Sequence, residues 1–386
     1  MLAATDTAES DRILRAYAVR TGIRASGASG TRYLWTDAYA VLTLCALHRT
    51  TGDGKHLQRA ITLAHLVHQV LGRHREDDTR VGWISGLDEA DGARRPTAGG
   101  LRIGKPLPER REGEPLDDRA EWERDGQYFH YLTKWMHALC ALALSTGDAA
   151  WSAHAVELAQ AAVRGFVRPS RAGEPPRIAW KMSIDLSRPL VSTSGQHDAL
   201  DGLAAIAFVR ATHHRVARAP AQLDHCIDTM RRCCAEGAVW GTPDALGIGG
   251  LLSATATIAG LTAEGELAFD GMLHTLLADA HRSLDFLSET RTFSAPIESR
   301  LAFRELGLAI GLDAVGPMLV DIRRHPDRFG NAASARALAE RIESLSRHAP
   351  LARTICATWR HPTAQASRSW RAHEDINAVM LAACLA

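Results

Sequence analysis

Residues 121–135 read EWERDGQYFHYLTKW and open the helix that sets this chain apart. If the helix begins after Gly126, four functional side chains share one stripe at i, i+3, i+4 and i+7: Gln127, His130, Tyr131 and Lys134. Residues 138–144 are apolar, so we expect this helix to be buried all round, with polar chemistry in its first turns. The alternative is a helix whose polar face simply meets water, but such a helix would keep polar residues beyond its first turns. The pattern therefore predicts a pocket at the N-terminal end of the helix.

This helix belongs to a repeated hairpin. It ends at the turn 146–148, Thr-Gly-Asp, and a helix with a single apolar face follows. The same order occurs earlier, where an apolar helix over 38–47 ends at the Thr-Gly-Asp turn 51–53. Superposing the two turns also superposes Ala60 on Ala155, Leu63 on Leu158 and Ala64 on Ala159. The sequence therefore predicts an internal repeat of helical hairpins.

The pattern continues to the end of the chain. Buried helices are predicted over 196–210, 243–261 and 298–312, and one-faced helices over 221–235, 269–287 and 332–345. The first helix, 10–22, is expected to pair with the last, 373–385. This pairing gives an all-α domain, 1–386, of six hairpins in two concentric rings, with buried helices inside. Strand-like sequence occurs only at 177–182, in a connection.

Long connections mark one end of the predicted rings. They cover residues 74–124, 167–195, 288–297 and 346–371, while the Thr-Gly-Asp turns lie at the other end. Connections longer than about 12–15 residues usually carry function or are disordered. We expect the loop over about 74–124 to be an ordered lid on the site side.

Composition excludes several classes of partner. The chain has 386 residues, 46% hydrophobic and 23% charged, with a formal net charge of +1, so nucleic acid is not an expected partner. No apolar run reaches the roughly 18 residues of a membrane span. No secretory signal is recognisable, and the odd count of 7 cysteines fits a reducing compartment, so a cytoplasmic location is expected. The cysteines around 226–234 match no usual zinc spacing, and neither metal nor cofactor is expected.

On these features the chain resembles the six-hairpin glycosidase superfamily, the (α/α)6 toroids, and in particular bacterial members without an assigned reaction. Besides the hairpin repeat, the likeness lies in Trp35-Thr36-Asp37, Asp125-Gly126-Gln127-Tyr128 and His373-Glu374-Asp375-Ile376-Asn377. Relatives on this fold include glycoside hydrolases, unsaturated-uronide hydrolases, polysaccharide lyases and sugar epimerases. The resemblance implies a small-molecule carbohydrate substrate and leaves the reaction open.

Carboxylates at the starts of the buried helices predict a glycoside hydrolase. Glycoside hydrolysis needs two carboxyl groups, one to protonate the leaving oxygen and one to act as base or nucleophile. Asp125 and Asp198 are the first candidates, with Asp37 and Glu374 in reserve. The structural alternative is helix capping, which is the commonest role of Asp at such positions and applies most to Asp37.

Other side chains are candidates for binding the sugar. Trp35 and Trp83 lie at junctions of loop and helix and could stack on a sugar face, whereas most aromatic residues serve the core. The stripe of Gln127, His130, Tyr131 and Lys134 could bind hydroxyl groups. Arg102 and Lys105, in the segment GGLRIGK, could hold an anionic substituent, although a solvated loop explains them as well.

Two alternatives stand beside hydrolysis. His197 and His373 open two different buried helices, and two imidazoles can move a proton at carbon in a sugar epimerase or isomerase. The second alternative is a helical binding module without catalysis, which would lack a deep polar funnel. The oligomeric state is left open by the sequence.

Overall fold

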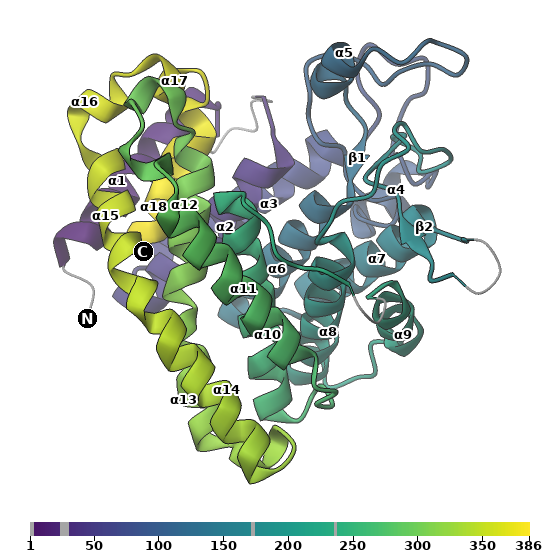
Figure 1. The fold of residues 1–386 in the computed structure, drawn as a ribbon. Coiled ribbons are helices and arrows are strands. Elements are labelled where there is room, and N and C mark those ends of the chain that lie inside the picture. Colours follow the sequence, from purple (N-terminus) through teal and green to yellow (C-terminus); the bar gives the residue numbers. More distant parts are fainter. Residues whose placement is uncertain (1–3, 24–30, 171–173, 235–237) are drawn as a thin grey trace. The chain divides into compact units, whose positions relative to one another are not determined.

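A computed structural model describes residues 4–23, 31–170, 174–234 and 238–386. The chain divides into two compact units: residues 14–235, here called the N-terminal unit, and residues 1–13 with 236–386, the C-terminal unit. Both are built from helices (Figure 1), which confirms the predicted all-α class.

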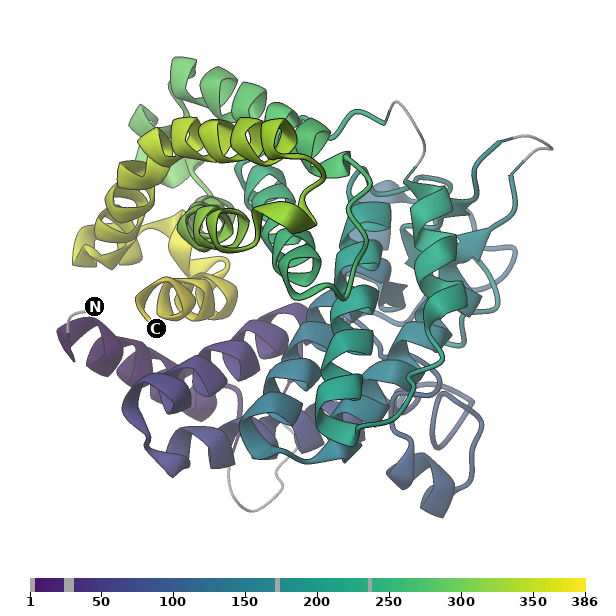
Figure 2. The same cartoon turned by 90° about the horizontal axis from the view of Figure 1, so that it is seen from below.

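Three helical hairpins make up most of the N-terminal unit. They pair α2 (Leu34–Thr51) with α3 (Gly54–Leu71), α6 (Phe129–Thr146) with α7 (Ala149–Phe166), and α8 (Asp198–Ala217) with α9 (Asp224–Cys233). Both views show the partners side by side (Figures 1 and 2). Helix α6 also packs against α2 and α8, so the first turns of these three helices can share one site.

The two Thr-Gly-Asp turns are equivalent. Gly52 and Gly147 end their helices with φ of 73° and 71°, a left-handed conformation that glycine adopts without strain. The Asp53 and Asp148 side chains then cap the next helices, accepting from Lys55 N and Ala150 N, each at 2.9 Å. The aligned positions of α3 and α7 are all buried, which confirms the predicted repeat: Ala60, Leu63, Ala64, Ala155, Leu158 and Ala159.

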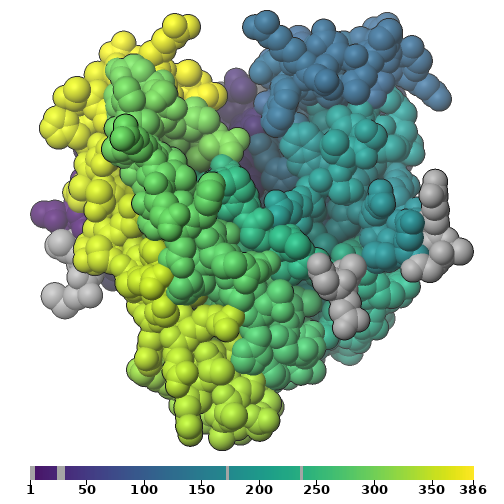
Figure 3. Space-filling view, in the orientation of Figure 1, coloured from purple at the N-terminus to yellow at the C-terminus, as the bar shows by residue number. Residues whose placement is uncertain are grey.

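The connection over 74–124 is ordered and stands at one end of the N-terminal unit, in blue in Figure 3. It contains α4 (Glu89–Arg94) and α5 (Asp118–Glu123) and leads into β1 (Gln127–Tyr128). β1 pairs antiparallel with β4 (Lys181–Met182), while β2 (Val167–Arg168) pairs with β3 (Arg177–Ile178). Two connections far apart in sequence are thereby tied together beside the start of α6.

The C-terminal unit corrects one predicted pairing, that of 298–312 with 332–345. The segment predicted as one buried helix, 298–312, is α12 (Ala302–Asp313), and its hairpin partner is α15 (Ala349–Arg360), inside a stretch predicted to be a connection. The helix expected to be its partner is α14 (Ala332–Leu345), which packs against α11 (Met272–Glu289) and an additional helix, α13 (Val315–Arg324). The remaining helices are α10 (Ala245–Glu264), α16 (Pro362–Gln365), α17 (Arg368–Arg371) and α18 (Glu374–Leu385), with short 3-10 turns at Thr292–Ser294, Ile297–Ser299, Pro326–Arg328 and Ser346–His348.

The first helix, α1 (Ala4–Arg20), meets the last helix as predicted, since Ser10 Oγ donates to the Ala382 carbonyl at 2.8 Å. Arg360 of α15 forms ion pairs with Asp6 and Glu9 of α1. By length and composition α10 could cross a membrane, but 61% of its apolar window is buried, and core helices of soluble proteins pass the same test.

Candidate functional site

The start of α6 organises the candidate site. The helix begins at Phe129, two residues later than predicted, because Gln127 and Tyr128 form β1. Gln127 therefore leaves the predicted stripe: its side chain is buried, accepts from Leu101 N at 2.9 Å, and donates to Gly99 O and Ile184 O. His130, Tyr131 and Lys134 remain on α6.

A continuous group of aromatic rings surrounds His130 and Tyr131. Trp35, at the start of α2, lies 5.2 Å from the Tyr131 ring and 6.0 Å from the His130 ring, measured between centroids. On the other side His130 stacks on Tyr128 at 5.3 Å and lies parallel to Trp180 at 6.3 Å. Trp180 carries no signal of its own in the sequence, because it lies in the irregular connection before α8.

Polar groups from α6 and α8 meet beside these rings. Nδ1 of His130 is 3.7 Å from Oδ1 of Asp198, in the first turn of α8. Oδ2 of Asp198 is buried and has no hydrogen-bond partner among the described protein atoms. Asp201 follows one turn later and interacts electrostatically with Lys134 and His197. Three of the predicted helix starts thus meet in one place.

Burial keeps the Asp198 carboxyl and the His130 imidazole uncharged at pH 7. Desolvation, reinforced by Asp201, raises the pKa of Asp198 from 3.8 to about 8. Desolvation, reinforced by the charge of Lys134, lowers the pKa of His130 to about 3. The Asp198 carboxyl is therefore protonated and the His130 imidazole neutral, so their contact is an acid beside a base and no ion pair.

Asp125 is occupied by structural contacts instead. Its Oδ1 accepts from the backbone N–H groups of Gly104 and Gly126, at 2.9 and 3.0 Å, and its Oδ2 accepts from Arg102 Nη1 at 2.5 Å and from Arg75 Nη1 at 3.4 Å. The side chain is fully buried. These contacts fix the connection against β1 and leave no oxygen for a substrate. The Arg102 guanidinium is used as well, since it also donates to Arg73 O and Val70 O, each at 2.6 Å.

Two more predicted site residues, Asp37 and Trp83, are enclosed by contacts within the protein. Asp37 is buried, accepts from Tyr17 Oη at 2.5 Å, and pairs with Arg32 at 3.3 Å. Trp83 is 2% exposed and lies against Gly92 inside the connection, so its faces are covered by protein. Neither residue is placed to touch a sugar.

The remaining predicted residues are more peripheral. Lys105 is half-buried, its Nζ lies 5.5 Å from the Tyr33 ring centroid, and burial lowers its pKa. Tyr33 Oη is in turn 2.5 Å from Tyr131 Oη, so Lys105 borders the aromatic group. His373 and Glu374 are exposed at the start of α18, in the C-terminal unit. Their participation with residues of the N-terminal unit stays a prediction.

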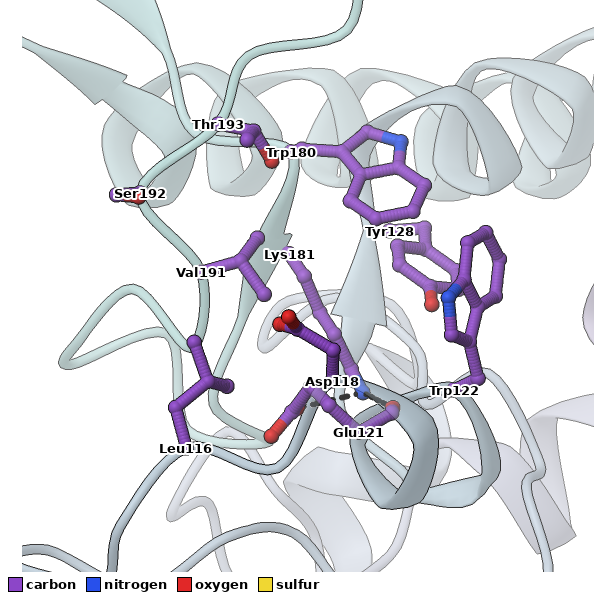
Figure 4. Close-up of a pocket in the computed structure, with 10 residues that line it drawn as sticks. All are labelled: Leu116, Asp118, Glu121, Trp122, Tyr128, Trp180, Lys181, Val191, Ser192 and Thr193. Atoms are coloured by element: carbon purple, nitrogen blue, oxygen red, sulfur yellow. Dashed lines mark hydrogen bonds and ion pairs between the residues drawn. The ribbon is translucent and has the colours of Figure 1, made fainter.

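A pocket of about 210 Å³ adjoins the aromatic group (Figure 4). Its walls are α5, the β1–β4 pair and the segment 191–193: Leu116, Asp118, Glu121, Trp122, Tyr128, Trp180, Lys181, Val191, Ser192 and Thr193. Tyr128 and Trp180 belong both to this pocket and to the rings around His130. Among the described residues, no group of three or more His, Cys, Asp or Glu side chains is arranged to hold a metal ion.

The solved structures similar to this chain include two sugar epimerases. The first, a cellobiose 2-epimerase from Spirochaeta thermophila, aligns over 87% of this chain and 98% of its own, with a TM-score of 0.46 and 12% identity. The second, a sugar epimerase from a ruminal bacterium, aligns over 88% and 85%, with a TM-score of 0.37 and 10% identity. No family model and no curated protein matches the chain. Neither likeness assigns a reaction, because identity is low and one fold hosts many reactions.

Proposed function

We propose that this chain is a carbohydrate-active enzyme that moves a proton at a sugar carbon, as a sugar epimerase or isomerase does. The observation that supports it is the pair of His130, which is partly exposed, and Asp198, which is buried: they lie 3.7 Å apart, with a protonated carboxyl next to a neutral imidazole. The aromatic rings on both sides of His130 would bind the apolar faces of a sugar ring.

The proposed reaction begins from the open-chain sugar. The imidazole of His130 accepts the proton from the carbon next to the carbonyl, and the C–H electron pair forms the C=C bond of an enediol. The carbonyl oxygen takes the proton of Asp198 at the same time. For the epimer, water gives a proton to the opposite face of the same carbon, the enediol hydroxyl returns its proton to Asp198, and His130 releases its proton to water. For the isomer, His130 gives its proton to the former carbonyl carbon, and the hydroxyl proton on the neighbouring carbon passes to Asp198.

The low pKa of His130 is compatible with this role because the pair works as a unit. Imidazolium forms only as Asp198 becomes a carboxylate, so the new positive charge has a negative partner at 3.7 Å. The net charge of the pair does not change, which matters because an isolated charge is costly in a buried site. Lys134 and Asp201 would bind sugar hydroxyls beside the pair.

Glycoside hydrolysis is the second candidate, supported by the same Asp198. A general acid catalyst must hold its proton near neutral pH, and a pKa of about 8 satisfies that requirement. The second carboxyl would be Asp201 rather than Asp125, because the oxygens of Asp125 are all engaged in the protein.

Isotope labelling separates these reactions. We expect a panel of aldoses, ketoses and disaccharides, incubated in D₂O, to gain deuterium at the carbon next to the carbonyl without bond cleavage, detected by NMR. Asp198→Asn should reduce this exchange by roughly 10²–10⁴-fold, whereas Asp228→Asn, on an exposed carboxylate of α9, should not.

If ¹⁸O from labelled water enters the product and the glycosidic bond is cleaved, the reaction is hydrolysis and the proposed proton transfer is wrong. If neither label enters any sugar, both enzymatic proposals fail, and a binding module is then the better description of this chain.

A further inference from the structure

The pocket beside Trp122 has the dimensions of a small binding subsite. Its volume, about 210 Å³, is below the roughly 300–1,000 Å³ of pockets that take a drug-sized ligand, so it suits a single ring. The pocket is separate from the place where His130 and Asp198 meet, because Tyr128 and Trp180 lie between the pocket and His130. A group bound there would therefore lie one aromatic ring away from the reacting sugar.

The aromatic walls favour a ring with apolar faces. Trp122 and Trp180 meet at 5.3 Å with an interplanar angle of 73°, and Tyr128 lies 5.0 Å from Trp180. Figure 4 shows these three rings together on one side of the pocket, opposite Leu116 and Val191. Trp122 is 55% exposed, so part of its ring is open to a ligand in the pocket.

The charges in the pocket disfavour an anionic ligand. The Lys181 ammonium is fully buried and already donates to Glu121 Oε1, Glu121 O and Arg124 O at 2.7–2.8 Å. Glu121 also accepts from Arg110 at 3.1 Å, so its charge is balanced within the protein. Asp118 is left as an exposed carboxylate at the rim, and it would repel a uronate, sulfate or phosphate.

We propose that this pocket is a subsite for an uncharged pyranose unit linked to the reacting sugar, so that the substrate is a neutral disaccharide or longer glycoside. The assignment rests on the proposed function for the identity of the reacting sugar. The hydroxyl of Thr193 and the Asp118 carboxylate would bind the hydroxyl groups of the linked unit, while Trp122 covers its face. An apolar aryl group could use the rings and would leave these polar groups without a function.

Calorimetric titration tests the subsite without requiring turnover. The probes are neutral α- and β-linked disaccharides of glucose, galactose and mannose, each compared with its methyl monosaccharide. For wild type, at least one disaccharide should bind more tightly than its monosaccharide. Trp122→Ala should lower that affinity ratio roughly tenfold, the scale of one lost aromatic stacking contact, and Trp122→Phe should restore part of it. Phe286→Ala, which removes an equally exposed ring (55%) on α11, should leave the ratio unchanged.

Other outcomes overturn the proposal. Equal affinity for disaccharides and monosaccharides, or a ratio that Trp122→Ala does not alter, removes the subsite. Tighter binding of a disaccharide with a uronic acid, or of a phenyl glycoside in place of the disaccharide, would assign the pocket to a different ligand. Since binding is also measured in Asp198→Asn, a subsite that binds as expected in a protein without proton exchange would stand even if the proposed reaction fails.

Discussion

Asp125 shows how a buried carboxylate at a helix start can serve the fold alone. Both of its oxygens are engaged, and its strongest partner, Arg102, comes from the preceding connection. We expect Asp125→Ala to destabilise the protein by about 3–5 kcal/mol, because it leaves the buried Arg102 guanidinium without a counter-charge. Denaturant unfolding measures this, and Asp228→Ala is the surface control. A variant with unchanged stability and no activity would return Asp125 to the list of catalysts.

Asp198 should make the protein less stable as pH rises. Its pKa is raised from 3.8 to about 8 on folding, so between these values the unfolded chain has lost a proton that the folded protein retains. The free energy of unfolding then falls by up to about 1.4 kcal/mol per pH unit from this group. Asp198→Asn removes that contribution, so its stability relative to wild type should rise from pH 5 to pH 7.

Unfolding titrations of both proteins at pH 5, 6 and 7 measure this difference, with Asp228→Asn as the control for a surface carboxylate. His130, whose pKa is lowered on folding, acts in the opposite direction below about pH 6.5. It is present in both proteins and cancels in the comparison. A difference that stays constant with pH would show that Asp198 titrates normally.

At the level of elements, the two Thr-Gly-Asp turns should behave alike. Gly52 and Gly147 both have positive φ, and a Cβ at either position would meet no atom within 4 Å. Replacement by alanine therefore costs only backbone strain, about 1 kcal/mol in each case. Unfolding of Gly52→Ala, Gly147→Ala and the double variant should show equal and additive losses. A loss several times larger at one turn would mean that the two hairpins are not equivalent.

These turns also show what the sequence predicts well. The chain reverses at each Thr-Gly-Asp turn because the glycine adopts a left-handed conformation and the aspartate caps the next helix. Both causes are local in sequence, so both hairpins could be predicted. The pairing of α12 with α15 could not, because α15 presents only Ala352, Ile355 and Trp359 as buried positions in a short helix. Gln127 was misplaced for a similar reason: its partners, such as Ile184, lie in another connection.

The candidate site was predictable in place but not in detail. Buried helices with polar first turns indicated where it would lie, and His130, Tyr131, Lys134, His197 and Asp198 do meet there. The sequence could not rank Asp125 against Asp198, because both are carboxylates that open an apolar helix. Their difference arises from long-range contacts, since Arg102 neutralises one and Trp180 helps enclose the pair formed by the other.

For the whole molecule, the prediction of a single domain over residues 1–386 has a thermodynamic consequence. If the chain is one cooperative domain, heating should give one transition, with equal calorimetric and van't Hoff enthalpies. Differential scanning calorimetry measures both quantities. Two separate transitions, each assignable by variants such as Gly52→Ala in the N-terminal unit, would show that the two compact units unfold independently.

The most direct test of the account is the protonation state of Asp198 in the intact protein. A ¹³C NMR titration of protein labelled at the aspartate carboxyl carbons, with Asp198→Asn used to assign the signal, measures its pKa. An acid–base pair requires a midpoint near pH 8, with the carboxyl protonated beside a neutral His130 at pH 7. A midpoint near pH 4 would make Asp198 an ordinary carboxylate and would contradict the acid–base pair on which the proposed function rests.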